Sequence, residues 1–258
     1  MEYCVRPCRQ PATCVGIDLA GVPHRETGVA VLRAGQLDLL TSAHEDDEIL
    51  ALAALAGPAG TVAINAPLGL PRGRCCLDDD CPCRHDPGTR SRESERALLH
   101  MGVPTLATAL LKVLARRGYA LAAALRAAGW EPLEVYPFAT LRLLGLPTAG
   151  KRTPLGRRRI HDALQALVPG LDHPDASEHR LDAIVCAYTA ALWRQGLTRT
   201  LGAADEGLMV IPDVAALAAT AGAAEAAPRL VAETQAPYRT DLGADLTAEH
   251  AEHAEEPS

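Results

Sequence analysis

Apolar and polar positions near the start of the chain follow a strand-like pattern three times in succession. This pattern predicts strands over residues 14–20, 27–33 and 36–42. Residues 46–55 begin with acids and continue with apolar positions at helical spacing, which predicts a helix ended by Gly57-Pro58. A short apolar run at 61–65 then ends at Asn65. This part of the chain therefore predicts the order β-β-β-α-β.

The rest of the chain alternates helical and strand-like runs. Helical spacing marks five segments, at residues 105–118, 120–129, 138–145, 156–167 and 177–195. Strand-like runs cover residues 132–136 and 209–212, and the second run suits the edge of a sheet. Three hairpin-linked strands followed by strands that alternate with helices predict an α/β fold, in which helices pack on a mixed sheet.

Composition divides the chain into a folded body and a tail. Residues 1–213 form one expected domain, with an insertion at about 68–104 that is polar and rich in Cys, Asp and Arg. From residue 214 the chain is dominated by Ala, Glu, Pro and Thr, which predicts a disordered tail or a loosely attached helix. Residues 214–258 carry eight acids and two arginines, so most of the net charge of −7 lies there. The body is near neutral, and its charge does not exclude a nucleic-acid ligand.

The chain shows no sign of a membrane or secretory segment. No apolar run approaches the roughly 18 residues that a membrane helix needs, and no signal-peptide stretch follows the N-terminus. We expect a soluble, cytoplasmic protein without a membrane partner, whose oligomeric state the sequence does not predict. Eight cysteines in such a chain favour metal ligation or reactive thiols over disulfides.

Acidic side chains recur within the predicted elements where an active site would collect them. Asp18 lies on the first strand, Glu134 on the strand at 132–136, and Asp182 on the last long helix. A lone acid in an apolar strand costs free energy unless a metal ion or another partner pairs with it. Carboxylates that converge from distant elements stay charged together around divalent cations, which can activate water for phosphodiester cleavage. The alternatives are a turn-capping Asp18, a solvent-facing Glu134 and a solvated helix flank at Asp182.

Four short motifs, taken in order, resemble a known family. They are Gly16-Ile17-Asp18-Leu19-Ala20 with Arg25, Thr27 and Gly28; Ala63-Ile64-Asn65-Ala66-Pro67-Leu68; Glu134-Val135-Tyr136-Pro137; and Leu181-Asp182-Ala183. The family they resemble is domain of unknown function 429, described as predicted nucleases of RNase H fold. The resemblance spans about residues 15–212. It implies an RNase H-like mixed sheet, with three antiparallel N-terminal strands, further parallel strands and helices on both faces.

The resemblance also implies a metal site. Asp18, Glu134 and Asp182 would hold Mg²⁺ or Mn²⁺. His179 precedes the helix-borne acid, as in Holliday-junction-resolvase-like members of the fold, and could assist a metal-bound water; the alternative is a surface histidine. The family pattern has an Asp at the end of the fourth strand, where this chain has Asn65. An amide oxygen can accept but brings no charge, so we expect Asn65 to be a weak fourth ligand.

A basic segment follows the Tyr-Pro motif. Residues 151–159 hold five cations and resemble the Lys-then-Arg stretch of the family. We expect Lys151, Arg157 and Arg159, together with Arg25, to contact phosphates. A solvated basic loop is the alternative. Few aromatic residues interleave with the cations, so the segment does not favour base stacking on single strands.

The insertion contains a dense run of soft metal ligands. Cys76, Cys81, Cys83 and His85 could bind a structural Zn²⁺, with Cys75 as a spare ligand. The spacing matches no common zinc-finger pattern. One alternative is a site shared with the N-terminal cysteines, which are Cys4, Cys8 and Cys14. The other is a redox-active or unliganded loop.

The expected function is divalent-metal-dependent hydrolysis of phosphodiester bonds in DNA or RNA. A second interpretation keeps the RNase H-like fold without the chemistry, because Asn65 replaces an expected acid. The protein would then bind nucleic acid or a protein partner. A third interpretation is an actin-like nucleotide binder, which would need a second, duplicated hairpin.

Overall fold

The computed structural model describes residues 13–85 and 90–223, and these residues contain one seven-stranded sheet. Its strands are β1 (Thr13–Asp18), β2 (Thr27–Arg33), β3 (Gln36–Ala43), β4 (Thr61–Asn65), β5 (Leu133–Val135), β6 (Thr198–Leu201) and β7 (Met209–Pro212). The strand order is β3-β2-β1-β4-β5-β7-β6. The strand pairs β1-β2, β2-β3 and β6-β7 are antiparallel, and the other three pairs are parallel. The expected α/β mixed sheet is confirmed, and its order is consistent with an RNase H-like arrangement.

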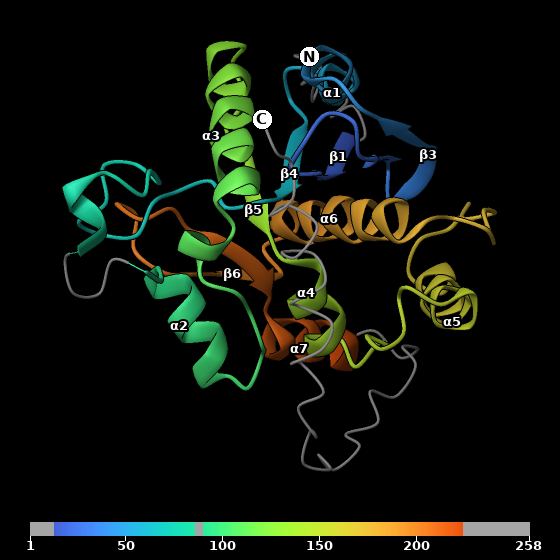
Figure 1. Ribbon diagram of the computed structural model, residues 1–258. Helices are drawn as coiled ribbons and strands as arrows, with labels where there is room; N and C mark the ends of the chain where they lie inside the picture. The colour runs from blue at the N-terminus through green and yellow to red at the C-terminus, as the bar shows by residue number, and fades with distance from the viewer. Residues whose placement is uncertain (1–12, 86–89, 224–258) are drawn as a thin grey trace, which may run out of the picture. The chain divides into compact units, whose positions relative to one another are not determined.

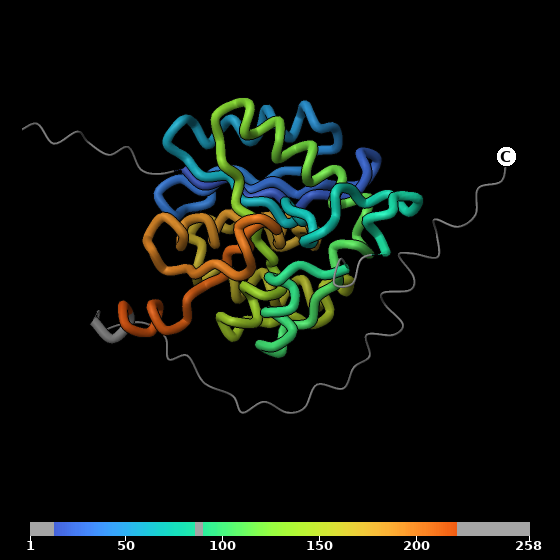
Figure 2. The backbone as a smooth tube through the Cα atoms, turned by 90° about the vertical axis from the view of Figure 1, so that its left-hand side faces the viewer, coloured from blue at the N-terminus to red at the C-terminus, as the bar shows by residue number. Residues whose placement is uncertain are grey.

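Helices cover both faces of this sheet. The α-helices of the described residues are α1 (Asp46–Ala53), α2 (Glu93–His100), α3 (Lys112–Ala127), α4 (Pro137–Leu143), α5 (Pro154–Gln165), α6 (Glu178–Arg194) and α7 (Val214–Ala223). In Figure 1 the long helix α6 runs below β1 and β4, while α1 and α3 lie above the strands. Figure 2 shows the same layers from the side. None of these helices is long and apolar enough to cross a bilayer.

Alternation along the strands builds a separate core on each face. Val15 and Ile17 pack in the cluster that includes Leu121 of α3. Cys14, one position out of phase, belongs to the cluster that includes Ile184 of α6. Because successive strand residues point to opposite faces, Asp18 lies on the α6 side at the end of β1.

Two glycines allow α6 to approach the sheet closely. A Cβ atom on Gly16 would lie 2.1 Å from the carbonyl oxygen of Ala183, and one on Gly28 would lie 2.1 Å from that of His179. Any side chain at either position would therefore push the helix away from β1 and β2. This contact brings the first turns of α6, with His179 and Asp182, to the end of β1.

The two helices expected over 105–118 and 120–129 are in fact one. A 3₁₀ turn at Thr108–Leu110 precedes α3, which continues without a break through Gly118. A Cβ atom on Gly118 would lie 2.8 Å from the carbonyl oxygen of Pro67. This glycine permits close packing against the chain that leaves β4, and it does not end a helix.

The sheet also extends further than the sequence predicts. The segment at 209–212 is not the edge strand, because β6 pairs with it on the outer side. The β6 segment is missed because only Leu201 among its four residues is buried. Residues 214–223 form α7, whose first turn donates backbone N–H bonds to Asp213 Oδ1. The tail expectation for 224–258 falls outside the described residues, as do Cys4 and Cys8.

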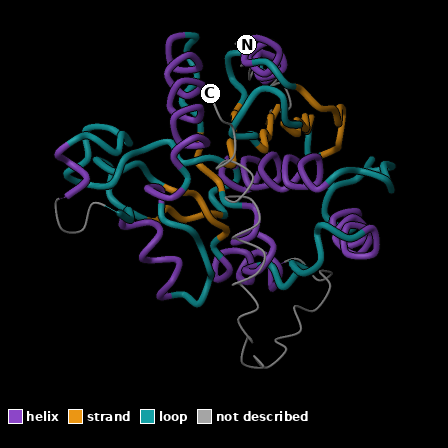
Figure 3. The backbone as a smooth tube through the Cα atoms, in the orientation of Figure 1, coloured by secondary structure: helices purple, strands orange, loops and turns teal. Residues whose placement is uncertain are grey.

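The insertion between β4 and α2 is largely loop. Among the described residues of this segment, Figure 3 shows no strand, and the regular structure there is a short 3₁₀ turn at Pro82–His85. The described residues contain one antiparallel meander of the β1-β2-β3 type. The antiparallel β6-β7 pair is a second hairpin among these residues, but it has two strands and does not duplicate the β1-β2-β3 meander, as an actin-like nucleotide binder would need.

Candidate functional site

The site is built where the adjacent parallel strands β1 and β4 end side by side. Their register places Asp18 opposite Asn65. Asn65 Nδ2 donates to Asp18 Oδ1 at 2.5 Å, and His179 Nδ1 lies 2.7 Å from Asp18 Oδ2. Asp18 is 5 % exposed. Each carboxylate oxygen of Asp18 therefore has a protein partner.

Helix α6 supplies two further groups to the same place. Ser177 caps the helix by accepting a hydrogen bond from the backbone N–H of Arg180. His179 lies in the first turn, and Asp182 follows three residues later on the same side of the helix. Lys151, in the loop before α5, donates a charge-assisted hydrogen bond to Asp182. Four segments distant in sequence thus contribute Asp18, Asn65, Lys151 and the pair from α6.

Burial and neighbouring charge set the protonation of Asp182. Burial raises its pKa to about 6, and the negative charge of Asp18 adds to the rise while Lys151 opposes it. The two acids are therefore close enough to affect each other. Clustered ionisable groups of this kind are typical of functional sites, because they cost stability where apolar residues would not.

His179 is expected to titrate far above an ordinary histidine. The hydrogen bond to Asp18 raises its pKa from 6.5 to about 9, although burial opposes the rise. The folded state therefore gains stability from this pair below about pH 6.5, and loses it as the pH rises through about 9. An NMR titration should show the high pKa in the native chain and a value near 6.5 after Asp18→Asn. An ordinary value in the native chain would contradict the pairing.

The basic residues expected at phosphates are spread over several positions. Lys151 reaches the site directly, through Asp182. Arg157 turns back on its own loop, and its Nη1 donates to the carbonyl oxygens of Lys151 and Arg152 at 3.4 Å and 3.1 Å. Arg159 on α5 and Arg25 in the β1–β2 turn are exposed. Arg157 therefore acts on the loop that positions Lys151.

Glu134 does not join Asp18 and Asp182, although the sequence suggested that the three would converge. The register of β4 and β5 pairs Glu134 with Ile64, whose side chain packs on the α1–α3 face. Asn65, one residue later, points to the α6 face. Glu134 is 3 % exposed and accepts two hydrogen bonds from the guanidinium of Arg92. The period of the strand thus assigns this acid to the other face of the sheet.

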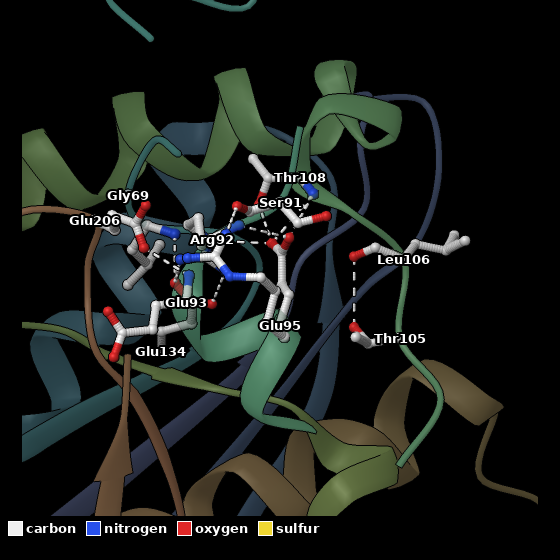
Figure 4. A network of polar contacts seen from close by, with 12 residues as sticks. Gly69, Ser91, Arg92, Glu93, Glu95, Thr105, Leu106, Thr108, Glu134 and Glu206 are labelled. Carbon is white, nitrogen blue, oxygen red and sulfur yellow. Dashed lines mark hydrogen bonds and ion pairs between the residues drawn. The ribbon is translucent and has the colours of Figure 1, made fainter. Parts of the chain in front are cut away.

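Arg92 is the centre of a buried polar network that the sequence did not reveal (Figure 4). It is 1 % exposed, and its Nε also donates to Glu95 Oε1 at 3.1 Å. Glu95 accepts from the backbone N–H of Thr108 at 3.1 Å. Buried Glu206 accepts from the backbone N–H of Glu93 at 2.6 Å. An arginine three residues before a glutamate at a helix start is the signal that could have identified the Arg92–Glu95 pair.

A cavity of about 190 Å³ is lined by Arg92 and Glu95 of the buried network and touches the Asp18 group through Asn65. Asn65 and Glu134 both line it, and most of its remaining surface comes from apolar side chains such as Leu106, Leu111 and Met209. The cavity opens at the carboxyl ends of β4 and β5. It therefore offers an apolar recess beside the Asp18 group.

The acids of the site fit a divalent cation only in part. Asp18 and Asp182 offer hard carboxylate oxygens, the ligand type that Mg²⁺ and Mn²⁺ prefer. Glu134 is committed to Arg92. In the described part of the chain, the one group of three or more potential ligands with all ligand atoms within 4.8 Å is made of cysteines. A cation at Asp18 would thus rest on two carboxylates and an amide oxygen.

Comparison with known proteins adds a family to this geometry. A family model described as "Protein of unknown function (DUF429)" matches residues 16–207. No curated protein and no solved structure shows significant similarity to the chain. The matched span includes every side chain of the Asp18 group.

Proposed function

The chain belongs to the DUF429 family, and we propose that it hydrolyses phosphodiester bonds of a nucleic acid with the help of Mg²⁺ or Mn²⁺. The observation that carries the proposal is the convergence of Asp18, His179 and Asp182, joined by Lys151, at the ends of β1 and β4. In open α/β sheets, ligands bind outside the carboxyl ends of the strands. The end of β1 is such a place, because β1 pairs antiparallel with β2 on one side and parallel with β4 on the other.

Asp18 and Asp182 are the side chains that would hold the cation. The Asn65 amide oxygen would join them only if the amide turned, because its Nδ2 donates to Asp18 Oδ1. A bound divalent cation would supply a water of lowered pKa and neutralise negative charge on the phosphate. Lys151 pairs with one oxygen of Asp182, so a cation could use the other. The ammonium group of Lys151 would also be a suitable partner for a phosphate oxygen bound beside that carboxylate.

His179 is suited to donate a proton. In the site without a cation, the hydrogen bond to Asp18 raises the pKa of His179 to about 9, so the imidazole is protonated at neutral pH, and the same bond fixes the orientation of the ring through Nδ1. A protonated ring can donate to a phosphate oxygen or to the leaving oxygen of the cleaved ester. This role differs from assistance to the attacking water, which requires the neutral ring.

Exposed positive charge supports a nucleic acid as the substrate. A nucleic acid presents a row of phosphates, and the exposed Arg25 and Arg159 lie on separate segments of the chain. Lys151 would contact the reacting phosphate, and the arginines would contact its neighbours. Replacing either arginine should weaken binding in a salt-dependent way without removing catalysis.

The Asn65→Asp variant tests whether the site holds a cation. The amide donates to Asp18 in the native chain, and a carboxylate in its place adds a charged ligand. We expect the Mn²⁺ affinity measured by calorimetry to rise about tenfold, which corresponds to about 1.4 kcal/mol. Asp162→Asn, which removes a surface carboxylate paired with Arg158, is the matched control and should leave the affinity unchanged. Equal affinity in Asn65→Asp and the native chain would count against the site.

A second candidate function is a catalytically inactive module that binds nucleic acid or a protein. One observation favours it: both oxygens of Asp18 and one of Asp182 already have donors within the chain. Such a site is satisfied without a cation. Nucleic-acid binding that persists in EDTA and after Asp18→Asn, without any cleavage, would support this candidate.

A further inference from the structure

Four thiols gather in the insertion between β4 and α2, away from the proposed hydrolytic site. Cys75, Cys76, Cys81 and Cys83 have their sulfur atoms within 4.8 Å of one another, and all four are free cysteines. Cys75 Sγ and Cys81 Sγ are 3.4 Å apart. Four sulfurs so close together are unusual in a loop unless something joins them.

The spacing of the sulfurs matches a small tetrahedral ion. A Zn–S bond of about 2.3 Å places neighbouring sulfurs of a tetrahedral site about 3.8 Å apart. The 3.4 Å separation and the 4.8 Å limit lie on either side of this value. A single disulfide would join two of the sulfurs and would not explain why the other two lie close to them. A four-iron cluster would hold its four cysteine sulfurs further apart than one metal ion does.

The loop has few buried apolar side chains to stabilise it, which favours a structural ion. Between Pro71 and His85, Leu77 is the large apolar side chain that is buried, at 2 % exposure. The loop also makes exposed ion pairs with α3, between Asp78 and Arg116 and between Asp79 and Lys112. Exposed pairs of this kind contribute little to stability. A segment with so small an apolar core is the kind that a structural metal orders.

We propose that Cys75, Cys76, Cys81 and Cys83 bind one structural Zn²⁺ through their four thiolates. The ligand set differs from the sequence expectation, because Cys75 replaces His85. His85 is exposed at the end of the 3₁₀ turn and does not belong to the group. Cys14 is also excluded, since it is buried in the core between β1 and α6.

The position of the loop gives the ion a consequence. Before the thiols, Leu68 donates its backbone N–H to Glu134, and Arg72 donates its own to Glu206. After the thiols in sequence, the guanidinium of Arg92 donates a hydrogen bond to Glu134. The zinc would therefore stiffen a loop whose two ends meet at the same buried glutamate.

Metal analysis of the purified full-length chain tests the proposal. Protein prepared under reducing conditions without chelator should contain one zinc per chain by elemental mass spectrometry. X-ray absorption should show four sulfur neighbours at about 2.3 Å. His85→Ala is the matched control and should keep the zinc, whereas Cys75→Ser should lose it. A native chain without stoichiometric zinc, or with a Cys75–Cys81 disulfide, would overturn the proposal.

Two further measurements cover the case in which Cys75→Ser does not fold. The double variant Cys4→Ser, Cys8→Ser should retain its zinc, and loss of the metal there would contradict a site made by the loop alone. Removal of zinc from the native chain by a competing chelator should speed tryptic cleavage after the exposed Arg84 at least tenfold. Equal cleavage rates with and without zinc would contradict a structural role. None of these measurements depends on hydrolytic activity.

Discussion

Replacing Arg92 with methionine is expected to lower the free energy of unfolding by about 3–5 kcal/mol, the cost of breaking a buried ion pair. The guanidinium is 1 % exposed and bonds to Glu134 and Glu95, which are also buried. Methionine fills the volume but leaves both carboxylates without their cation. Many domains are stable by only about 5–15 kcal/mol, so the variant should approach the limit of folding. Urea denaturation of both chains measures the difference.

Two companion variants make this result specific. Arg126→Met removes an exposed arginine that pairs with Glu131, and it should change the unfolding free energy by less than about 1 kcal/mol. Adding Glu134→Gln to Arg92→Met should recover part of the loss, because it removes one buried charge. A change below about 1 kcal/mol in Arg92→Met would mean that the network does not stabilise the fold.

The second large effect concerns catalysis. Asp18→Asn should lower the rate of metal-dependent cleavage at least about a hundredfold, the lower range for losing the proton donor that Asp18 orients, His179. The variant removes a charge that would hold the cation and the partner that keeps His179 protonated. Initial rates on a cleaved substrate give the ratio.

Asp162→Asn is the control for the loss of a carboxylate, because its acid lies on the surface beside Arg158. Its rate should match that of the native chain. A thermal melt of each variant separates lost chemistry from lost folding. If Asp18→Asn keeps its rate within twofold, Asp18 is not part of the reaction.

Much of the fold follows from periodicity. The limits of β2 and β4 agree with those predicted from the sequence, because their apolar runs are bounded by turn residues. Gly118 misled the prediction of α3, since a glycine that permits a close contact looks the same in sequence as one that ends a helix. The β6 segment was missed because a polar edge strand has no hydrophobic signal.

The sequence predicts which elements carry the site residues, but it does not predict which face of the sheet each residue occupies. The places of Asp18 and Asp182 on the first strand and the last long helix single them out, and the family resemblance adds His179. The structure brings the three together. Glu134 lies on the other face of the sheet. The face on which its side chain lies depends on the register of β5 against β4, which the sequence alone does not fix. The partner of Glu134 could not be predicted either, because Arg92 lies 42 residues away in the chain.

The most direct test of the hydrolytic site is a cleavage assay of the native chain on a panel of labelled nucleic acids. Single-stranded, duplex, hybrid and branched DNA and RNA would each be incubated with Mn²⁺, Mg²⁺ or EDTA. The account predicts cleavage of at least one substrate that requires the metal and stops in EDTA. No cleavage of any substrate, with binding that persists in EDTA, would contradict it and leave the Asp18 group as part of a binding module.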